Sequence, residues 1–134
     1  MSVNLDDYRE QLEGIDPALH ATLAANFAEA TRVMSPAGLH HYLEGTRALS
    51  QLGRGNDLIT SYIESLPAVA KEAGEDVIKD CVNAALKLAS MVSGEVIGLL
   101  FTAMPTAARR LGDAELLRGY LSLIHQLSAK VLTG

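Results

Sequence analysis

The chain repeats a pattern of apolar residues at intervals of 38 to 39 positions, and this repeat constrains its fold more than any other feature. Pro67 corresponds to Pro105, 38 positions later, and Gly74 corresponds to Gly112 at the same distance. A second series recurs every 39 positions and consists of Tyr42, Cys81 and Tyr120. Self-similarity at this period is typical of arrays of stacked helical hairpins.

Apolar residues recur at helical spacing in seven segments. We expect these helices at about residues 3–14, 17–34, 36–52, 58–73, 77–92, 95–111 and 114–131. The predicted fold is all-α: antiparallel helical hairpins stacked as a short HEAT-like α-solenoid. A closed helical bundle could satisfy the same stripes and is the alternative. We divide the predicted single domain, residues 1–134, into N-terminal cap helices (1–35), two repeats (36–74 and 75–112) and a terminal helix (113–134).

Two of these helices carry features that predict particular behaviour. Pro67 and Pro105 lie inside helical patterns, where proline removes a backbone donor, so we expect a kink or a break at Pro67 and a bend at Pro105. The helix at residues 95–111 is apolar on nearly all sides, a pattern typical of a helix buried in the middle of a stack.

Charge and composition exclude some classes of function. The net charge is −5 and the sequence pI is about 5.3, which argues against a nucleic-acid surface. Residues 96–108 form the longest uncharged apolar run, too short to span a bilayer. No basic segment followed by an apolar one opens the chain, so we expect no signal peptide and a soluble, cytoplasmic protein.

No residue set indicates catalysis or a cofactor. His40 and Glu44, with His41 beside them, have a spacing that can bind a metal from one helix face, but a third ligand is missing and a polar helix face is the favoured interpretation. Cys81 lies in an apolar stripe, which predicts a buried thiol. Residues 53–57 contain two glycines but lack the Lys-Ser/Thr of a phosphate loop and predict a turn. We therefore expect neither an enzyme, nor a bound metal or cofactor.

The candidate partner-binding residues are basic and lie near the C-terminal end of the sequence. Arg109, Arg110 and Arg118 could form a ridge on the outer helices that contacts an acidic partner. A solvated helix face is the alternative interpretation of the same three residues.

Residues 42–53 read Tyr-Leu-Glu-Gly-Thr-Arg-Ala-Leu-Ser-Gln-Leu-Gly and are followed by an aliphatic stretch ending in Pro67, with an echo ending at Pro105. This style of repeat, over about residues 36–134, resembles the helical region that precedes the von Willebrand factor A domain in proteins of the CbbO and NorD type. The resemblance implies an adaptor that works with a MoxR-type AAA+ ATPase, in rubisco activation for the CbbO branch. The Asp-x-Ser-x-Ser metal motif of the A domain does not occur in the chain, which could be the N-terminal part of a longer protein or a stand-alone relative.

Three functions are therefore compatible with the sequence. The first is a non-enzymatic adaptor that binds a MoxR-type ATPase, or a client such as rubisco. The second is a small-molecule sensor with a ligand pocket around Met91, Phe101 and Met104, motivated by the small and apolar residues of the fifth and sixth helices. The third is a homo-oligomeric assembly domain, because a repeat array has apolar ends that need a cover.

Overall fold

The computed structural model of the chain describes residues 8–53 and 55–133. Within these ranges the chain forms seven α-helices and no strand. The prediction of an all-α fold is confirmed; the predicted helix at about residues 3–14 is only one turn long where it is described, and Leu5, which we placed on it, lies outside the described residues. The helices are α1 (Arg9–Leu12), α2 (Pro17–Val33), α3 (Pro36–Ser50), α4 (Asn56–Ala73), α5 (Val77–Leu88), α6 (Gly94–Leu111) and α7 (Ala114–Thr133).

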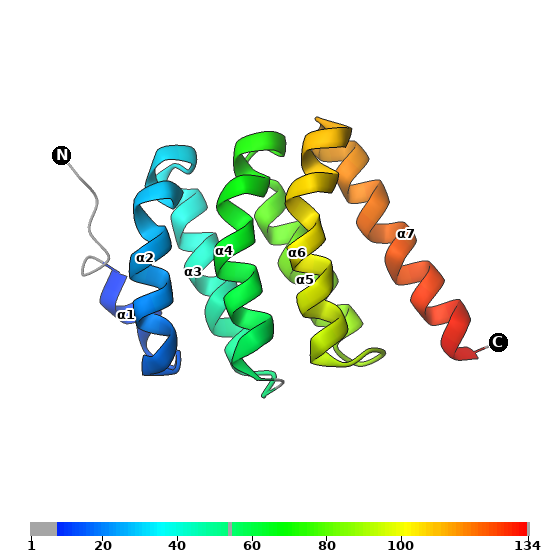
Figure 1. Cartoon of the computed structure of the whole chain (residues 1–134), viewed down its shortest axis with the longest axis horizontal. Helices are drawn as coiled ribbons and strands as arrows, with labels where there is room; N and C mark the ends of the chain where they lie inside the picture. The colour runs from blue at the N-terminus through cyan, green and yellow to red at the C-terminus, as the bar shows by residue number, and fades with distance from the viewer. Residues whose placement is uncertain (1–7, 54, 134) are drawn as a thin grey trace.

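The six longer helices stack as antiparallel hairpins in two layers (Figure 1). Helices α2, α4 and α6 form one layer, and α3, α5 and α7 form the other, with the short α1 packed against α3. The first and last hairpins lie at opposite ends of the stack, so the helices do not close into a bundle (Figure 1). The predicted HEAT-like stack is therefore the observed architecture.

Polar contacts between neighbouring hairpins join residues about one repeat apart. The Asn56 side-chain amide donates to an Asp16 carboxylate oxygen at 3.1 Å, across 40 positions. The Ser35 hydroxyl donates to a Glu75 carboxylate oxygen at 2.6 Å, also across 40 positions. Both bonds join the first hairpin to the second, so the separation of the bonded residues is close to the repeat length of the sequence.

The predicted starts of the second and third helices, at residues 17 and 36, are confirmed by the capping geometry. Asp16 caps α2 by accepting a hydrogen bond from the Ala18 backbone N–H at 2.9 Å, and Pro17 occupies the first helical position. Ser35 and Ser93 accept equivalent bonds at the starts of α3 and α6. These side chains satisfy backbone donors that have no partner within the helix.

The core is aliphatic with three aromatic rings that run through it from one hairpin to the next. The Tyr42 and Tyr62 rings stack with centroids 5.6 Å apart, and the Phe101 ring meets Tyr62 edge-on at 5.3 Å. All three side chains are fully buried. Because the rings come from α3, α4 and α6, they tie the middle of the stack together.

The two internal prolines do not break their helices, so of the two outcomes expected at Pro67 the break does not occur. Helices α4 and α6 continue through Pro67 and Pro105 as single elements (Figure 1). Pro67 has no N–H to donate to the carbonyl of Ile63, four residues earlier. The buried Tyr42 hydroxyl donates to this carbonyl instead. A side chain from α3 therefore satisfies the acceptor that the proline leaves without a helical partner.

Replacing Tyr42 by phenylalanine should destabilise the fold by about 1–3 kcal/mol, because the Ile63 carbonyl would remain buried without this donor. The Tyr62→Phe variant is the matched control. The Tyr62 hydroxyl donates to the Tyr42 carbonyl, which also accepts from the Thr46 hydroxyl, so its loss should cost less. Urea unfolding of both variants measures the difference. Equal losses of stability would contradict this role for Tyr42.

Candidate protein interface

The large apolar side chains that remain exposed in the described part of the chain all lie on the last two helices. Leu99 of α6 is 64% exposed, and Leu123 of α7 is 52% exposed. Monomeric proteins rarely leave large apolar patches open to water, so such a cluster indicates a contact surface. The five exposed residues are Val96, Leu99, Leu116, Tyr120 and Leu123.

On α6 the exposed side chains of Val96 and Leu99 stand at positions that are buried (Leu58) and half-buried (Ser61) in the preceding repeat. Val96 is 48% exposed, whereas its counterpart Leu58, 38 positions earlier in α4, is 2% exposed. Helix α6 itself covers that side of α4: a Cβ atom at Gly98 would lie 3.6 Å from the Leu58 Cα atom. The outer side of α6 is therefore equivalent to the side of α4 that receives the next hairpin.

Helix α7 follows the same rule at a spacing of 39 residues. Leu116, Tyr120 and Leu123 lie four and then three positions apart, which places them on one side of the helix. Their counterparts in α5 are all buried and are Val77, Cys81 and Ala84. In α5 these positions lie inside the stack, whereas in α7 no further hairpin of the described chain covers them.

The prediction that the helix at residues 95–111 is buried in the middle of the stack is wrong. Helix α6 is the last helix of its layer (Figure 1), and one of its apolar sides is open to solvent. A helix with apolar residues on all sides can be buried inside the stack, or it can have one side that is covered by another molecule. Both cases give the same sequence pattern. The sequence pattern does not distinguish the two cases, because Val96 is as apolar as its covered counterpart Leu58.

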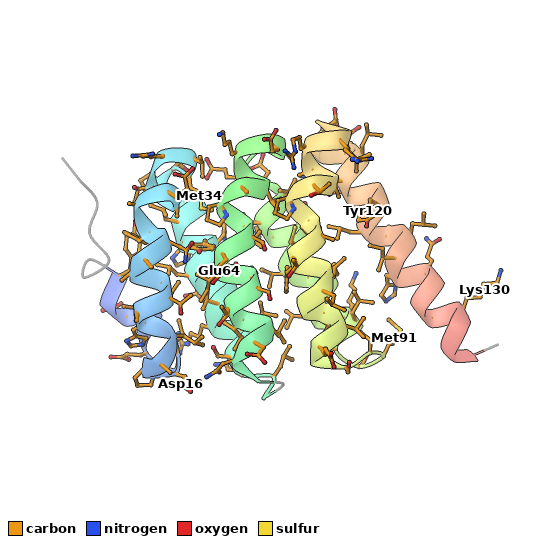
Figure 2. All side chains as sticks on the ribbon, viewed as in Figure 1. Asp16, Met34, Glu64, Met91, Tyr120 and Lys130 are labelled. Carbon is orange, nitrogen blue, oxygen red and sulfur yellow. The ribbon has the colours of Figure 1, made fainter. Side chains whose placement is uncertain are left out.

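An apolar groove of about 520 Å³ lies between the C-terminal half of α6 and the first half of α7. Tyr120 extends from α7 into this region (Figure 2). The groove is lined by Ala103, Thr106, Ala107, Arg110, Leu111 and Tyr120. We use the term end face for this groove together with the exposed apolar side chains, that is, Val96, Leu99, Ala103, Thr106, Ala107, Arg110, Leu111, Leu116, Tyr120 and Leu123.

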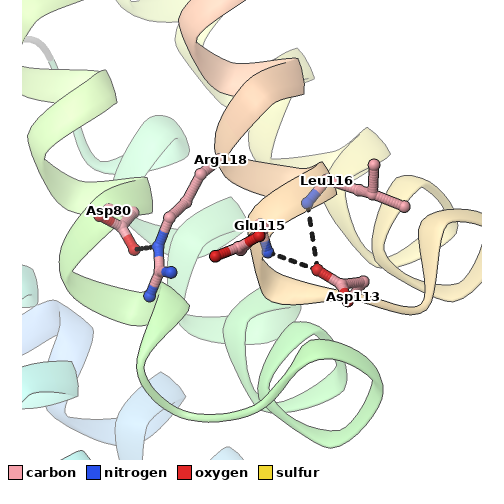
Figure 3. A network of polar contacts seen from close by, with 5 residues as sticks. All are labelled: Asp80, Asp113, Glu115, Leu116 and Arg118. Atoms are coloured by element: carbon pink, nitrogen blue, oxygen red, sulfur yellow. Dashed lines mark hydrogen bonds and ion pairs between the residues drawn. The ribbon is translucent and has the colours of Figure 1, made fainter.

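The three arginines predicted to bind a partner line three different grooves. Arg110 lies on the end face, while Arg109 lines a groove between the α2, α4 and α6 helices. Arg118 lies between α5 and α7, where its Nε atom is 2.6 Å from an Asp80 carboxylate oxygen (Figure 3). This hydrogen bond raises the pKa of Arg118 above its ordinary value. A single basic ridge is therefore not formed, and only Arg110 borders the apolar side chains.

The other residues considered from the sequence, as metal ligands, a thiol or a ligand pocket, do not form a functional site among the described residues. Among the described residues, no group of three or more His, Cys, Asp or Glu side chains is arranged to hold a metal ion, and this includes the region of His40, His41 and Glu44. Cys81 is fully buried as predicted, and burial raises the pKa of its thiol to about 12. Phe101 and Met104, which we considered as parts of a ligand pocket, are fully buried in the core.

Comparisons of the chain with protein-family models, with curated proteins and with solved structures found no match. In the part of the chain that the structure covers, no helix combines the length and the apolar character needed to cross a membrane.

Proposed function

We propose that this protein is a non-enzymatic adaptor module whose end face binds another protein. The observation that supports the proposal is the location of the exposed apolar side chains. They gather at one end of the stack, at positions that the next hairpin covers in the earlier repeats. A binding partner would take the place of that hairpin.

The energetics favour a large partner over a small one. Burying a leucine side chain fully contributes about 1.5–3 kcal/mol. Leu99, Leu116 and Leu123 are each more than half exposed, and they come from two helices. A small molecule in the groove beside Tyr120 would leave several of these side chains in water, whereas a helical surface could cover them together.

The resemblance to the helical region of CbbO- and NorD-type proteins makes a MoxR-type AAA+ ATPase, or a client such as rubisco, the first candidate partner. An acidic partner suits the exposed side chains of Arg109 and Arg110, which lie next to each other in the last turn of α6. Arg118 contributes less in this scheme, because Asp80 already pairs with it.

A pull-down of a MoxR-type ATPase with the purified full chain tests this function. Binding should be lost in a Leu99→Glu/Leu123→Glu variant, because both substitutions place a charge in the buried part of the contact. An Arg110→Ala variant should bind several-fold more weakly and with less dependence on salt, since it removes charge from the rim of the end face. The control is Ala25→Glu on α2, an exposed position away from the end face.

The function would be contradicted if the ATPase and rubisco both failed to bind the wild-type chain at tens of micromolar. Binding that persists in the Leu99→Glu/Leu123→Glu variant would show that the end face is not the contact. Circular dichroism of each variant confirms that the helices are retained, which is expected because the substituted side chains are exposed.

A further inference from the structure

We propose that a second copy of this chain covers the end face, with the two α6 helices packed antiparallel about a two-fold axis near Ala103. This inference rests on the proposed function, since it names the protein that binds the end face. A second copy and a heterologous partner would then compete for the same end face.

Only one end of the stack exposes large apolar side chains among the described residues, and this favours a two-fold contact over head-to-tail stacking. Helix α2, at the other end, has only buried or half-buried large apolar side chains in the described residues. Stacking head to tail would therefore place the apolar end face against a surface without matching side chains. A two-fold axis places the end face against itself, and such self-complementary interfaces are the commonest in oligomers.

The side chains along α6 match one another when a second α6 runs antiparallel. With the axis at Ala103, residues that lie the same number of positions before and after it face each other. Leu99 then comes opposite Ala107 of the second copy, which lines the apolar groove of about 520 Å³. The most exposed large apolar side chain among the described residues would thus enter an apolar groove. Alanine at the axis lets the two helix backbones approach closely.

The charges at the two ends of α6 also favour an antiparallel α6 pair with the axis at Ala103. Glu95 lies in the first turn and Arg110 in the last, and both are exposed. In the antiparallel pair Glu95 of each copy comes within one residue of the level of Arg110 of the other, so two opposite-charge pairs form at the edges of the contact. A parallel pair would bring Glu95 near Glu95 and Arg110 near Arg110, and like charges oppose such a contact.

Helix α7 is compatible with the same axis. Ala103 and Leu123 lie at nearly equal sequence distances from the turn at Gly112, so they stand at similar heights in the last hairpin. The two-fold rotation places the two α7 helices on opposite sides of the α6 pair, so the exposed Leu123 side chain would lie beside α6 of the second copy. Leu116 and Tyr120 extend the apolar part of the interface toward the turn.

Sedimentation velocity of the full chain with charge-reversed variants tests the proposal. The wild type should form dimers in a concentration-dependent manner. Glu95→Arg alone and Arg110→Glu alone should each weaken dimerisation at least about tenfold, because each creates two like-charge contacts. An equimolar mixture of the two single variants should form a heterodimer, since the arginine introduced in one copy then faces the glutamate introduced in the other. The Glu95→Arg/Arg110→Glu double variant should recover the wild-type dimer.

The matched control is Ala25→Arg, which adds a charge to an exposed position of α2 and should leave the dimer unchanged. Two results would overturn the inference: a wild-type chain that stays monomeric at hundreds of micromolar, or a mixture of the two single variants that stays monomeric. A monomeric chain that still binds the ATPase through Leu99 and Leu123 would reject the second copy while leaving the adaptor function standing. Dimerisation without ATPase or rubisco binding would support this inference and reject those partners.

Discussion

Replacing Gly45 by alanine should destabilise the protein by about 3 kcal/mol, because side chains of α4 and α5 leave no room for a Cβ atom at this position of α3. A Cβ atom at residue 45 would lie 2.3 Å from the Tyr62 hydroxyl oxygen and 2.6 Å from a Val82 methyl carbon. Tyr62 cannot easily move away, since its hydroxyl is bonded to the Tyr42 carbonyl at 2.9 Å and its ring stacks on Tyr42.

Gly98→Ala in α6 is the matched control, because it makes the same chemical change inside another helix. There the added Cβ atom would find its nearest neighbours at 3.6 and 3.7 Å, which is ordinary contact. Alanine favours helix over glycine by roughly 0.5–1 kcal/mol, so Gly98→Ala should stabilise the fold slightly.

Thermal and urea unfolding of the two variants measure the contrast. A loss of about 3 kcal/mol should lower the Tm of a chain of this size by about 10 °C. Similar melting temperatures for Gly45→Ala and the wild type would show that α3 does not pack on Tyr62 and Val82 as described.

The repeat was sufficient to predict the fold from the sequence. Its period places equivalent apolar residues on successive hairpins, and hairpins that cannot bury their apolar sides alone must stack. The helix starts were equally predictable, because Asp16-Pro17 and Ser35-Pro36 combine a capping side chain with a proline at the first helical position. Both signals are local or strictly periodic, and neither depends on distant contacts.

The continuity of α4 through Pro67 was less predictable, because it depends on a residue from another helix. Tyr42 lies 21 positions before Ile63, and its hydroxyl reaches the free carbonyl only once α3 and α4 have packed. The effect of a proline, when it is judged from its own helix alone, is a kink or a break. Here the Tyr42 hydroxyl supplies the hydrogen bond that the Ile63 carbonyl loses to Pro67, so this cause of a break is removed.

The candidate site was only partly predictable for a similar reason. Arg109, Arg110 and Arg118 are close in sequence, yet a turn between α6 and α7 separates the third from the first two, and Asp80 of α5 pairs with it. The end face depends on which apolar residues remain uncovered. An apolar residue at a covered position and one at an open position look alike in sequence, so Leu58 and Val96 become distinguishable only when the stack is known to end after α7 in the described chain.

Phe101→Ala should be among the most destabilising single substitutions in the chain, with a loss of about 3–5 kcal/mol. Phe101 is fully buried in α6 and meets the Tyr62 ring, so its removal would leave a cavity between α4 and α6. Leu99→Ala, two positions earlier, should change the free energy of unfolding of the monomer by less than about 0.5 kcal/mol, since that side chain is 64% exposed.

Only the Leu99→Ala substitution should weaken association, and this contrast separates the core of α6 from its end face. Leu99→Ala should weaken binding at the end face, because the side chain that enters the opposing groove is lost, while the fold remains intact. Phe101→Ala should lower stability but leave the exposed apolar side chains unchanged, so the folded fraction should still associate. Urea unfolding at low concentration measures the first property and sedimentation at low temperature the second. If Leu99→Ala unfolded the chain or Phe101→Ala left its stability unchanged, the assignment of the buried and open sides of α6 would be wrong.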